Sequence, residues 1–349
     1  MKSLAMLVGS ALLLLLPVPA RALDAAVPAT SPSLRVQDPK KRPPKPVRVD
    51  YSMVKRLFGM DPTVEAVDNP LTPEKVALGK LLYHEPSLSK NGNLSCASCH
   101  DLSTYGVDNK PRSPGSDGKE GERNSPTTYN AFRQFAQFWD GRAKNVEEQS
   151  TGPMLNAVEH GLADEAELVA RLKAKPELVA GFEKAFPGAD AVSVHNFRLA
   201  VGAFERTLVT KSRFDAYLDG DQKALTNEEK QGLNDFMQVG CITCHTTRLL
   251  GGNMFQKSGL LAPYPSEDLG RGKLTGNKAD DHFFKVPALL NVEKTAPYYH
   301  DGKVATLEEA VTKMAKLQLG KDLTEEQTAS IVTFLKALTG PLPEEFAKQ

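Results

Sequence analysis

The chain has 349 residues and carries 43 basic and 43 acidic side chains, so its formal net charge is zero. This balance argues against nucleic acid as a partner, because a phosphate backbone selects strongly basic surfaces. The length suits about two domains, with enough chain for a substantial core.

The first residues have the pattern of an export signal. An apolar run over residues 4–18 is followed by Ala20-Arg21-Ala22, a small-x-small cleavage pattern. We therefore expect residues 1–22 to be a signal peptide that is removed after Ala22 and directs the chain to the bacterial periplasm. The run is short for a membrane span, so an uncleaved anchor is the weaker alternative.

A proline-rich segment follows over residues 23–50. It contains almost no large apolar side chains and is basic around Lys40 to Lys45. Such a segment cannot bury a core, so we expect an extended or disordered linker.

Two helices are predicted directly before the two most informative stretches of the chain. Thr72 caps the first helix, which has Pro73 at its first position. Thr226 and Glu229 form a capping box for the second helix, which Gly240 ends.

The remaining predicted helices make the chain mostly α-helical with long loops. A long helical stretch between the two helices carries four large apolar side chains on one face, Phe197, Val201, Phe204 and Leu208. Two further helices begin at Thr306 and Thr324, and Gly340-Pro341 closes the last one. No convincing run of alternating strand residues occurs.

All four cysteines belong to two C-x-x-C-H runs, namely Cys96, Cys99 and His100 in the first and Cys241, Cys244 and His245 in the second. This run predicts covalent attachment of c-type haem, with the two thiols on the vinyl groups and the histidine on the iron. A redox-active cysteine pair has no need of the histidine, and a zinc site built from one run would have only three ligands. The sequence therefore predicts two haem c groups.

An internal duplication extends beyond these runs. Residues 139–148, from Trp139 to Glu148, are similar to residues 300–309, from His300 to Glu309. Two copies of haem motif, long loop, turn and capped helix suggest two cytochrome-c-like haem domains. We place them at residues 51–213 and 214–349.

The sixth coordination position distinguishes the two haems. Met314, on a predicted helix after the second motif, is a candidate thioether ligand that would give a low-spin iron of relatively high potential. Its alternative is a core position. The matching residue for the first haem is near Met154, which is a better candidate for packing because Gly152-Pro153 interrupts the helix. The other histidines are each more typical of loop or core positions: His84, His160, His195, His282 and His300.

From about Leu57 to the C-terminus the chain resembles the bacterial dihaem cytochrome c peroxidases, with both haem motifs in register. A branch of this family, which matures a tryptophan-derived cofactor on a partner protein, shares much of the pattern. The resemblance rests on five stretches, Leu71-Thr-Pro-Glu-Lys-Val-Ala-Leu-Gly79, Arg123-Asn-Ser-Pro-Thr127, Gln137-Phe-Trp-Asp-Gly-Arg142, Thr295-Ala-Pro-Tyr-Tyr-His-Asp-Gly302 and Gln318-Leu-Gly320.

The resemblance implies different roles for the two haems. The haem on His100 is expected to be the low-potential peroxidatic site, and the haem on His245 and Met314 the high-potential entry point for electrons. Methionine at position 314 favours the peroxidase, because the maturation branch has a tyrosine ligand there. Trp139 falls between the haems, where an indole could shorten the electron path or serve packing alone.

Further site residues follow from the same resemblance. Glu159 falls at the distal catalytic carboxylate, which could move a proton between the two peroxide oxygens, and Gln149 at a nearby distal amide. The Asn124 side chain and the backbone carbonyls of Thr295 and Pro297 match a calcium site built from hard oxygen ligands. The alternatives are a solvated helix face for Glu159 and a turn for Asn124.

One position departs from the family pattern. Relatives close the resting peroxidatic iron with a loop histidine, whereas alignment back from Arg123 places Ser116 there. We therefore predict an open first haem in the oxidised protein, with His160 as the leading substitute ligand.

Three functions are considered. Peroxide reduction is favoured, oxidation of a specific partner protein is the second candidate, and pure electron transfer is the third. A peroxidase would use hydrogen peroxide and a small cytochrome c or blue copper protein as donor, and the family tends to form homodimers.

Overall fold

The computed structural model describes residues 46–62 and 68–347. The predicted signal peptide, residues 1–22, lies outside the described residues, as does the predicted linker up to residue 45. The last five linker residues have no regular secondary structure and lead directly into the first helix.

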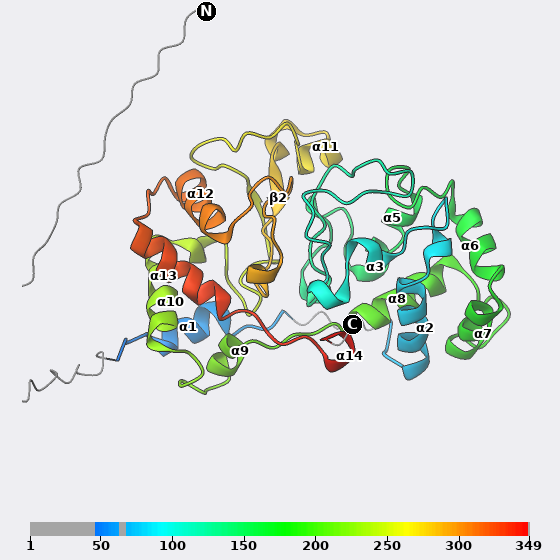
Figure 1. Cartoon of the computed structure of the whole chain (residues 1–349), viewed down its shortest axis with the longest axis horizontal. Helices are drawn as coiled ribbons and strands as arrows, with labels where there is room; N and C mark the ends of the chain where they lie inside the picture. The colour runs from blue at the N-terminus through cyan, green and yellow to red at the C-terminus, as the bar shows by residue number, and fades with distance from the viewer. Residues whose placement is uncertain (1–45, 63–67, 348–349) are drawn as a thin grey trace, which may run out of the picture. The chain divides into compact units, whose positions relative to one another are not determined.

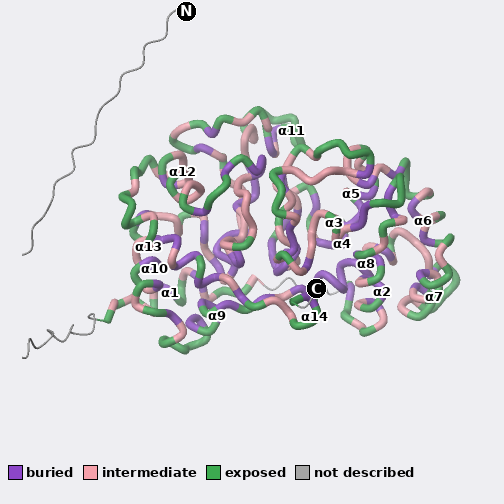
Figure 2. Tube along the Cα trace, viewed as in Figure 1, coloured by how far each residue is buried: buried purple, intermediate pink, exposed green. Residues whose placement is uncertain are grey.

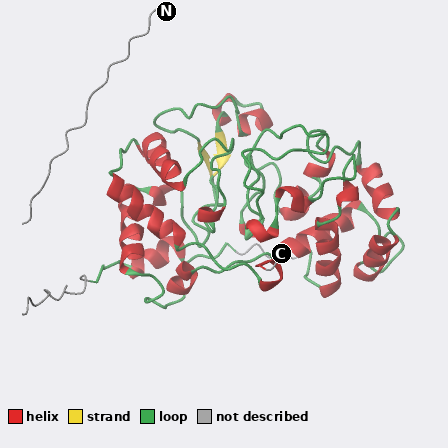
Figure 3. Ribbon diagram, viewed as in Figure 1, coloured by secondary structure: helices red, strands yellow, loops and turns green. Residues whose placement is uncertain are grey.

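Helices make up nearly all of the regular structure (Figures 1 and 3). The α-helices are α1 (Tyr51–Phe58), α2 (Pro73–Tyr83), α3 (Cys96–Cys99), α4 (Val146–Gln149), α5 (Gly152–Leu155), α6 (Glu165–Lys173), α7 (Pro176–Ala185), α8 (Val194–Glu205), α9 (Arg213–Leu218), α10 (Asn227–Val239), α11 (Arg271–Thr275), α12 (Leu307–Leu319), α13 (Glu325–Lys336) and α14 (Glu344–Ala347). The prediction of a mostly helical protein with long loops is confirmed.

The described residues contain one small sheet, which was not predicted. Strands β1 (Phe255–Lys257) and β2 (Phe283–Lys285) pair antiparallel, with Phe255 opposite Lys285. Three residues are too few for an alternating pattern to be visible in the sequence.

The predicted helix starts are confirmed. Thr72, Thr226, Thr306 and Thr324 each accept a hydrogen bond from the backbone N–H three residues later. Helix α13, however, ends at Lys336 rather than at Gly340. The backbone groups of the residues that follow form hydrogen bonds outside the helix. The carbonyl of Leu338 accepts from the N–H of Asn291 and the N–H of Gly340 donates to Asn291 Oδ1.

The same helix packing occurs twice. The helix before each haem motif, α2 or α10, packs against a later helix, α8 or α13. A glycine makes each close approach possible. A Cβ atom on Gly79 would lie 2.0 Å from the carbonyl oxygen of Ala200, and one on Gly232 would lie 2.1 Å from that of Ser330.

The apolar core consists of three clusters. Figure 2 marks the buried positions of the chain in purple. One joins α1 to α9, α10 and α13, and the other two join α2, α6, α7 and α8 with Phe346 of α14. The division into domains 51–213 and 214–349 stays a prediction. Packing contacts cross this predicted boundary, because α1 packs with residues that follow 213 and α14 packs with residues that precede 213.

The duplicated turns fold alike. In residues 137–143 and in residues 298–304, the backbone N–H of the first residue donates a hydrogen bond of 2.7 Å to the carbonyl of the last. Phe138 and Tyr299 have positive φ angles of 65° and 68°, and a glycine three residues further on has φ of 68° or 64°. This correspondence supports a common ancestral unit for the two halves.

Candidate functional site

The first haem motif lines a cavity of about 580 Å³. Cys96 and Cys99 are the ends of α3, which the Ser95–Ser98 capping box begins, and His100 follows at its C-terminus. The Nδ1 atom of His100 lies 3.3 Å from the carbonyl oxygen of Gly106. Because a carbonyl only accepts, Nδ1 carries the proton and Nε2 is free to bind a metal. Burial lowers the pKa of His100, so the ring is held in the neutral form that binds iron.

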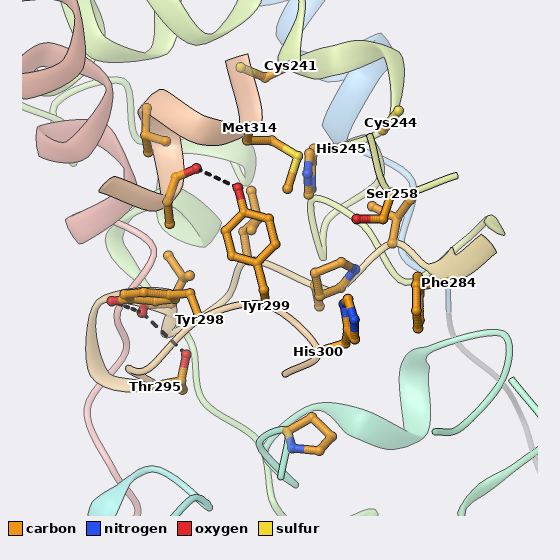
Figure 4. A pocket seen from close by; sticks show the side chains of 18 of the residues that line it. Cys241, Cys244, His245, Ser258, Phe284, Thr295, Tyr298, Tyr299, His300 and Met314 are labelled. Carbon is orange, nitrogen blue, oxygen red and sulfur yellow. Dashed lines mark hydrogen bonds between the residues drawn. The ribbon is translucent and has the colours of Figure 1, made fainter. Parts of the chain in front are cut away.

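The second motif lines a cavity of about 240 Å³, shown in Figure 4. His245 Nδ1 lies 2.8 Å from the carbonyl oxygen of Leu250, the same arrangement as in the first motif. Met314 of α12 lines this cavity with His245, and no other methionine does so among the described residues. The predicted pair of His245 and Met314 is therefore brought together.

The residues present fit covalently bound haem. All four cysteines are free thiols, and burial raises the pKa of Cys96 and of Cys241 to about 12. Protonated thiols do not suit a thiolate redox pair, whose cysteines have lowered pKa values. They are available for thioether bonds to vinyl groups.

A buried lysine in the second cavity also fits a haem. The Lys285 ammonium donates to the side-chain oxygen of Gln134, and both residues are buried in the cavity wall. Burial lowers the pKa of Lys285 to about 7, and no charged partner from the described part of the chain contributes. An anionic haem propionate would supply the missing counter-charge.

Predicted distal residues gather in the first cavity. Glu159 and Gln149 both line it, together with His160. Asn156 Nδ2 donates to Glu159 Oε1 over 2.8 Å. Burial raises the pKa of Glu159, while Arg142 and Asn156 act in the opposite direction. A carboxyl group whose pKa is raised beside a haem motif suits proton transfer.

Trp139 lines both cavities, as does its neighbour Phe138. Its indole N–H donates to the carbonyl of Asn124 over 2.8 Å, and its own carbonyl accepts from the backbone N–H of Lys285. The indole is thereby held in a wall that the two cavities share.

The three residues of the predicted calcium site line the same cavity. Asn124, Thr295 and Pro297 all line the second cavity, and the backbone N–H of Asn124 donates to the carbonyl of His300. Asn124 Nδ2 donates to the carbonyl of Lys110 over 2.9 Å, so its amide oxygen is the atom that would bind the ion.

Ser116 does not line the first cavity. Its hydroxyl donates to Asn93 Oδ1 over 2.8 Å and accepts from the N–H of Asn91, while its own N–H donates to the carbonyl of Glu159. The serine thus fixes its loop against the segment that carries Glu159.

Sequence reasoning missed three polar residues of the cavity walls. Arg142 lines the first cavity and stacks on Phe138, with its guanidinium carbon 3.4 Å from the ring centre. Glu205 of α8 lines the same cavity, and burial and then Glu147 raise its pKa to about 8. Arg142 belongs to the duplicated turn, which could have revealed it. No motif in the sequence around Glu205 or Lys285 indicates that these residues line a cavity.

Two C-x-x-C-H motifs, each opening into its own cavity in a mostly helical chain, define a dihaem c-type cytochrome. Residues 73–223 match the family described as di-haem cytochrome c peroxidase. The cytochrome c551 peroxidase of Nitrosomonas europaea is 42% identical to this chain over 294 residues, which cover 80% of this chain and 87% of the relative. The chain therefore belongs to the dihaem cytochrome c peroxidase family.

Two further relatives agree with this assignment. The methylamine utilization protein MauG of Methylorubrum extorquens is 36% identical over 69% of this chain and 68% of its own. The crystal structure of a MauG-like protein associated with microbial copper homeostasis is 29% identical and has a TM-score of 0.73, covering 83% of this chain and 96% of that one.

Proposed function

We propose that this protein reduces hydrogen peroxide to water at the first cavity, with electrons that enter at the second. By homology its enzyme class is cytochrome c peroxidase. The observation that carries the proposal is the contrast between the two cavities. The first is lined by a carboxyl group, an amide and a guanidinium, Glu159, Gln149 and Arg142, whereas the second presents the thioether of Met314.

Haem bound at His100 would supply the redox-active iron at which peroxide binds. Glu159 would then take the proton from the peroxide oxygen that approaches the metal and return it to the departing oxygen. Asn156 orients the carboxyl group through Oε1, and Arg142 favours its ionised form. Gln149 lines the same space and can hydrogen-bond to the substrate. The balance is one peroxide, two protons and two electrons to two waters.

Electron entry is proposed at His245 and Met314. A thioether ligand stabilises reduced iron better than an imidazole does, so this site would accept electrons from a donor and hold them ready. Trp139, in the shared wall, would lie on the path to the first cavity.

Oxidation of a specific partner protein is the second candidate, because MauG proteins are among the relatives. Met314 in the second cavity argues for the peroxidase, since the maturation branch has tyrosine at the matching position.

We further propose one calcium ion at Asn124, Thr295 and Pro297, export to the periplasm, and assembly as a homodimer. The neutral oxygen ligands that line one cavity support the calcium ion, and the need for haem attachment outside the cytoplasmic membrane supports export. None of the helices in residues 46–62 and 68–347 is long and apolar enough to span a membrane.

The test is peroxide-dependent oxidation of a reduced small cytochrome c, and separately of a reduced blue copper protein, by the purified holoenzyme. We expect two donor molecules to be oxidised for each peroxide consumed. Mixtures without enzyme give the background rate. Oxidation of neither donor above that background, with turnover of a protein-bound tryptophan precursor instead, would establish the maturation function.

A further inference from the structure

A row of aromatic rings leads away from the wall that the two cavities share. The ring centre of Trp139 lies 6.4 Å from that of His300, which lies 5.6 Å from that of Tyr264. Tyr264 in turn stacks on Tyr299, with centres 5.0 Å apart and planes inclined by 5°. Figure 4 shows Tyr299 and His300 in the lining of the second cavity. The function proposed above gives Tyr264 no role.

Tyr264 has a buried carboxylate as its hydrogen-bond partner. Its hydroxyl donates to Asp301 Oδ1 over 2.8 Å, and the two residues are 8% and 4% exposed. Asp301 Oδ2 is buried and has no hydrogen-bond partner in the described part of the chain, and the ammonium of Lys303 lies 3.6 Å from it. The hydrogen bond therefore provides a direct path for a proton from the Tyr264 hydroxyl to Asp301 Oδ1.

This pairing distinguishes Tyr264 from the other seven tyrosines, all of which the structure describes. Tyr298 and Tyr299, which also line the second cavity, donate to the backbone carbonyls of Val292 and Ala310. A backbone carbonyl cannot take up a proton at ordinary pH. Among the tyrosines within residues 46–62 and 68–347, only Tyr264 donates its hydroxyl to a carboxylate.

The chemistry requires such a partner. Burial, followed by the hydrogen bond to Asp301, raises the pKa of Tyr264, so the phenol is protonated at physiological pH. A phenol that loses an electron becomes strongly acidic, and oxidation is favourable only if the proton leaves as well. With Asp301 at hydrogen-bond distance, both can leave together.

We propose that Tyr264 is a redox-active residue, with Asp301 as its proton acceptor, that is oxidised when peroxide is turned over without a reduced donor. Tyr264 loses one electron, which passes along His300 and Trp139 and reduces a site in the protein that peroxide has oxidised. The proton passes to Asp301, and a neutral tyrosyl radical remains. A later electron from a donor restores the phenol, which takes its proton back.

The benefit would be protection of the second cavity. The Met314 thioether lines this cavity and can be oxidised to the sulfoxide, which would remove the proposed ligand. An oxidisable tyrosine that stacks on the cavity-lining Tyr299 can be oxidised in place of Met314.

The proposal rests on the proposed peroxidase function, because peroxide is the oxidant. Its test uses the holoenzyme, which is mixed with peroxide in the absence of donor and frozen for magnetic resonance. We expect a tyrosyl radical signal that narrows when the protein is made with ring-deuterated tyrosine. Tyr264→Phe and Asp301→Asn should each lower the signal at least tenfold. Tyr299→Phe, the matched control, should keep it.

Peptide mapping of the same samples gives an independent readout. The fraction of Met314 recovered as sulfoxide should rise in Tyr264→Phe, while turnover with a reduced donor stays at the wild-type rate. An undiminished radical signal in Tyr264→Phe would overturn the assignment. Normal peroxidase turnover without any tyrosyl radical would overturn this proposal alone, whereas absence of peroxide turnover in the wild type would overturn the proposed function as well.

Discussion

At the scale of single residues, Met314 is the proposed sixth ligand of the second haem. It lines the cavity with His245, whereas Met237 and Met254, which are nearer to the second motif in the sequence, do not line it. Position 314 lies in α12, which Thr306 begins and Gly320 ends. The helix therefore fixes the thioether relative to the cavity.

We predict that Met314→His lowers the reduction potential of the second haem. Imidazole donates more strongly than a thioether and stabilises ferric iron, and axial ligands shift haem potentials over about 0.8 V. The expected decrease is on the order of 0.1 V in a spectroelectrochemical titration, with Met254→Leu as the control that leaves the potential in place. An unchanged potential in Met314→His would mean that the residue only packs.

Residues whose role depends on distant partners could not be predicted. The haem motifs carry their chemistry in local spacing, whereas the roles of Met314, Trp139 and Glu159 were predicted through resemblance. Lys285 and Gln134, in contrast, are 151 positions apart in the chain. Tyr264 and Asp301 are 37 positions apart. Their burial and pairing arise only when the loops around the second cavity fold together.

At the scale of secondary-structure elements, the two glycine contacts carry the duplicated helix packing. Gly79 lets α2 approach α8, and Gly232 lets α10 approach α13. The sequence identified these helices by their caps but not their partners. Helix starts depend on adjacent residues, whereas packing partners depend on segments more than 90 positions away.

We predict that Gly79→Ala and Gly232→Ala each destabilise the protein by about 1–3 kcal/mol. Helix propensity alone predicts the opposite sign, a gain of up to about 1 kcal/mol. Denaturant unfolding of the holoenzyme measures the difference. Ala77→Ser, at an exposed position of α2, is the matched control and should change stability little. A gain in stability for either glycine variant would mean that the close approach is not required.

The loop around Ser116 bears on the resting state of the first haem. Its hydroxyl is engaged by Asn91 and Asn93, so it is not directed at the cavity. His160 does line the cavity, and its Nδ1 lies 3.0 Å from the carbonyl of Leu88. Donation through Nδ1 leaves Nε2 able to bind a metal, as in the two motif histidines.

We predict that the fully oxidised protein contains one high-spin and one low-spin haem and reacts with peroxide without prior reduction. Magnetic resonance spectra of the ferric enzyme measure the spin states. Two low-spin haems, one of which becomes high-spin in His160→Ala, would instead identify His160 as the ligand that replaces the loop histidine of relatives.

At the scale of the whole molecule, contacts join segments from before and after residue 213 next to the cavities. Arg123 pairs with Asp140 over 2.7 Å and with Asp268 over 2.6 Å. Asn130 and Asn291, which precede Trp139 and His300 by the same number of residues, both donate to Thr210 Oγ1. The proposed calcium ion would add a further link of this kind, from Asn124 to Thr295 and Pro297.

We predict that calcium chelation lowers peroxidase turnover and that added calcium, but not magnesium, restores it. Calcium tolerates an irregular set of neutral oxygen ligands, whereas magnesium requires near-octahedral geometry and retains water. Metal analysis should find about one calcium per chain in the wild type and less in Asn124→Ala. Full turnover after complete removal of calcium would contradict a role for the ion.

Comparing wild type with Glu159→Gln in kcat/KM for peroxide across pH tests most directly whether peroxide is reduced at this carboxylate. We predict that the variant keeps both haems and that its kcat/KM for peroxide is about a hundredfold lower or more, because glutamine cannot carry a proton. The wild type should lose activity as the pH falls through the raised pKa of Glu159, above the range of an ordinary glutamate, since the carboxylate is the form that accepts the proton. A fully loaded Glu159→Gln enzyme with a wild-type kcat/KM would contradict the claim that peroxide is reduced at this carboxylate.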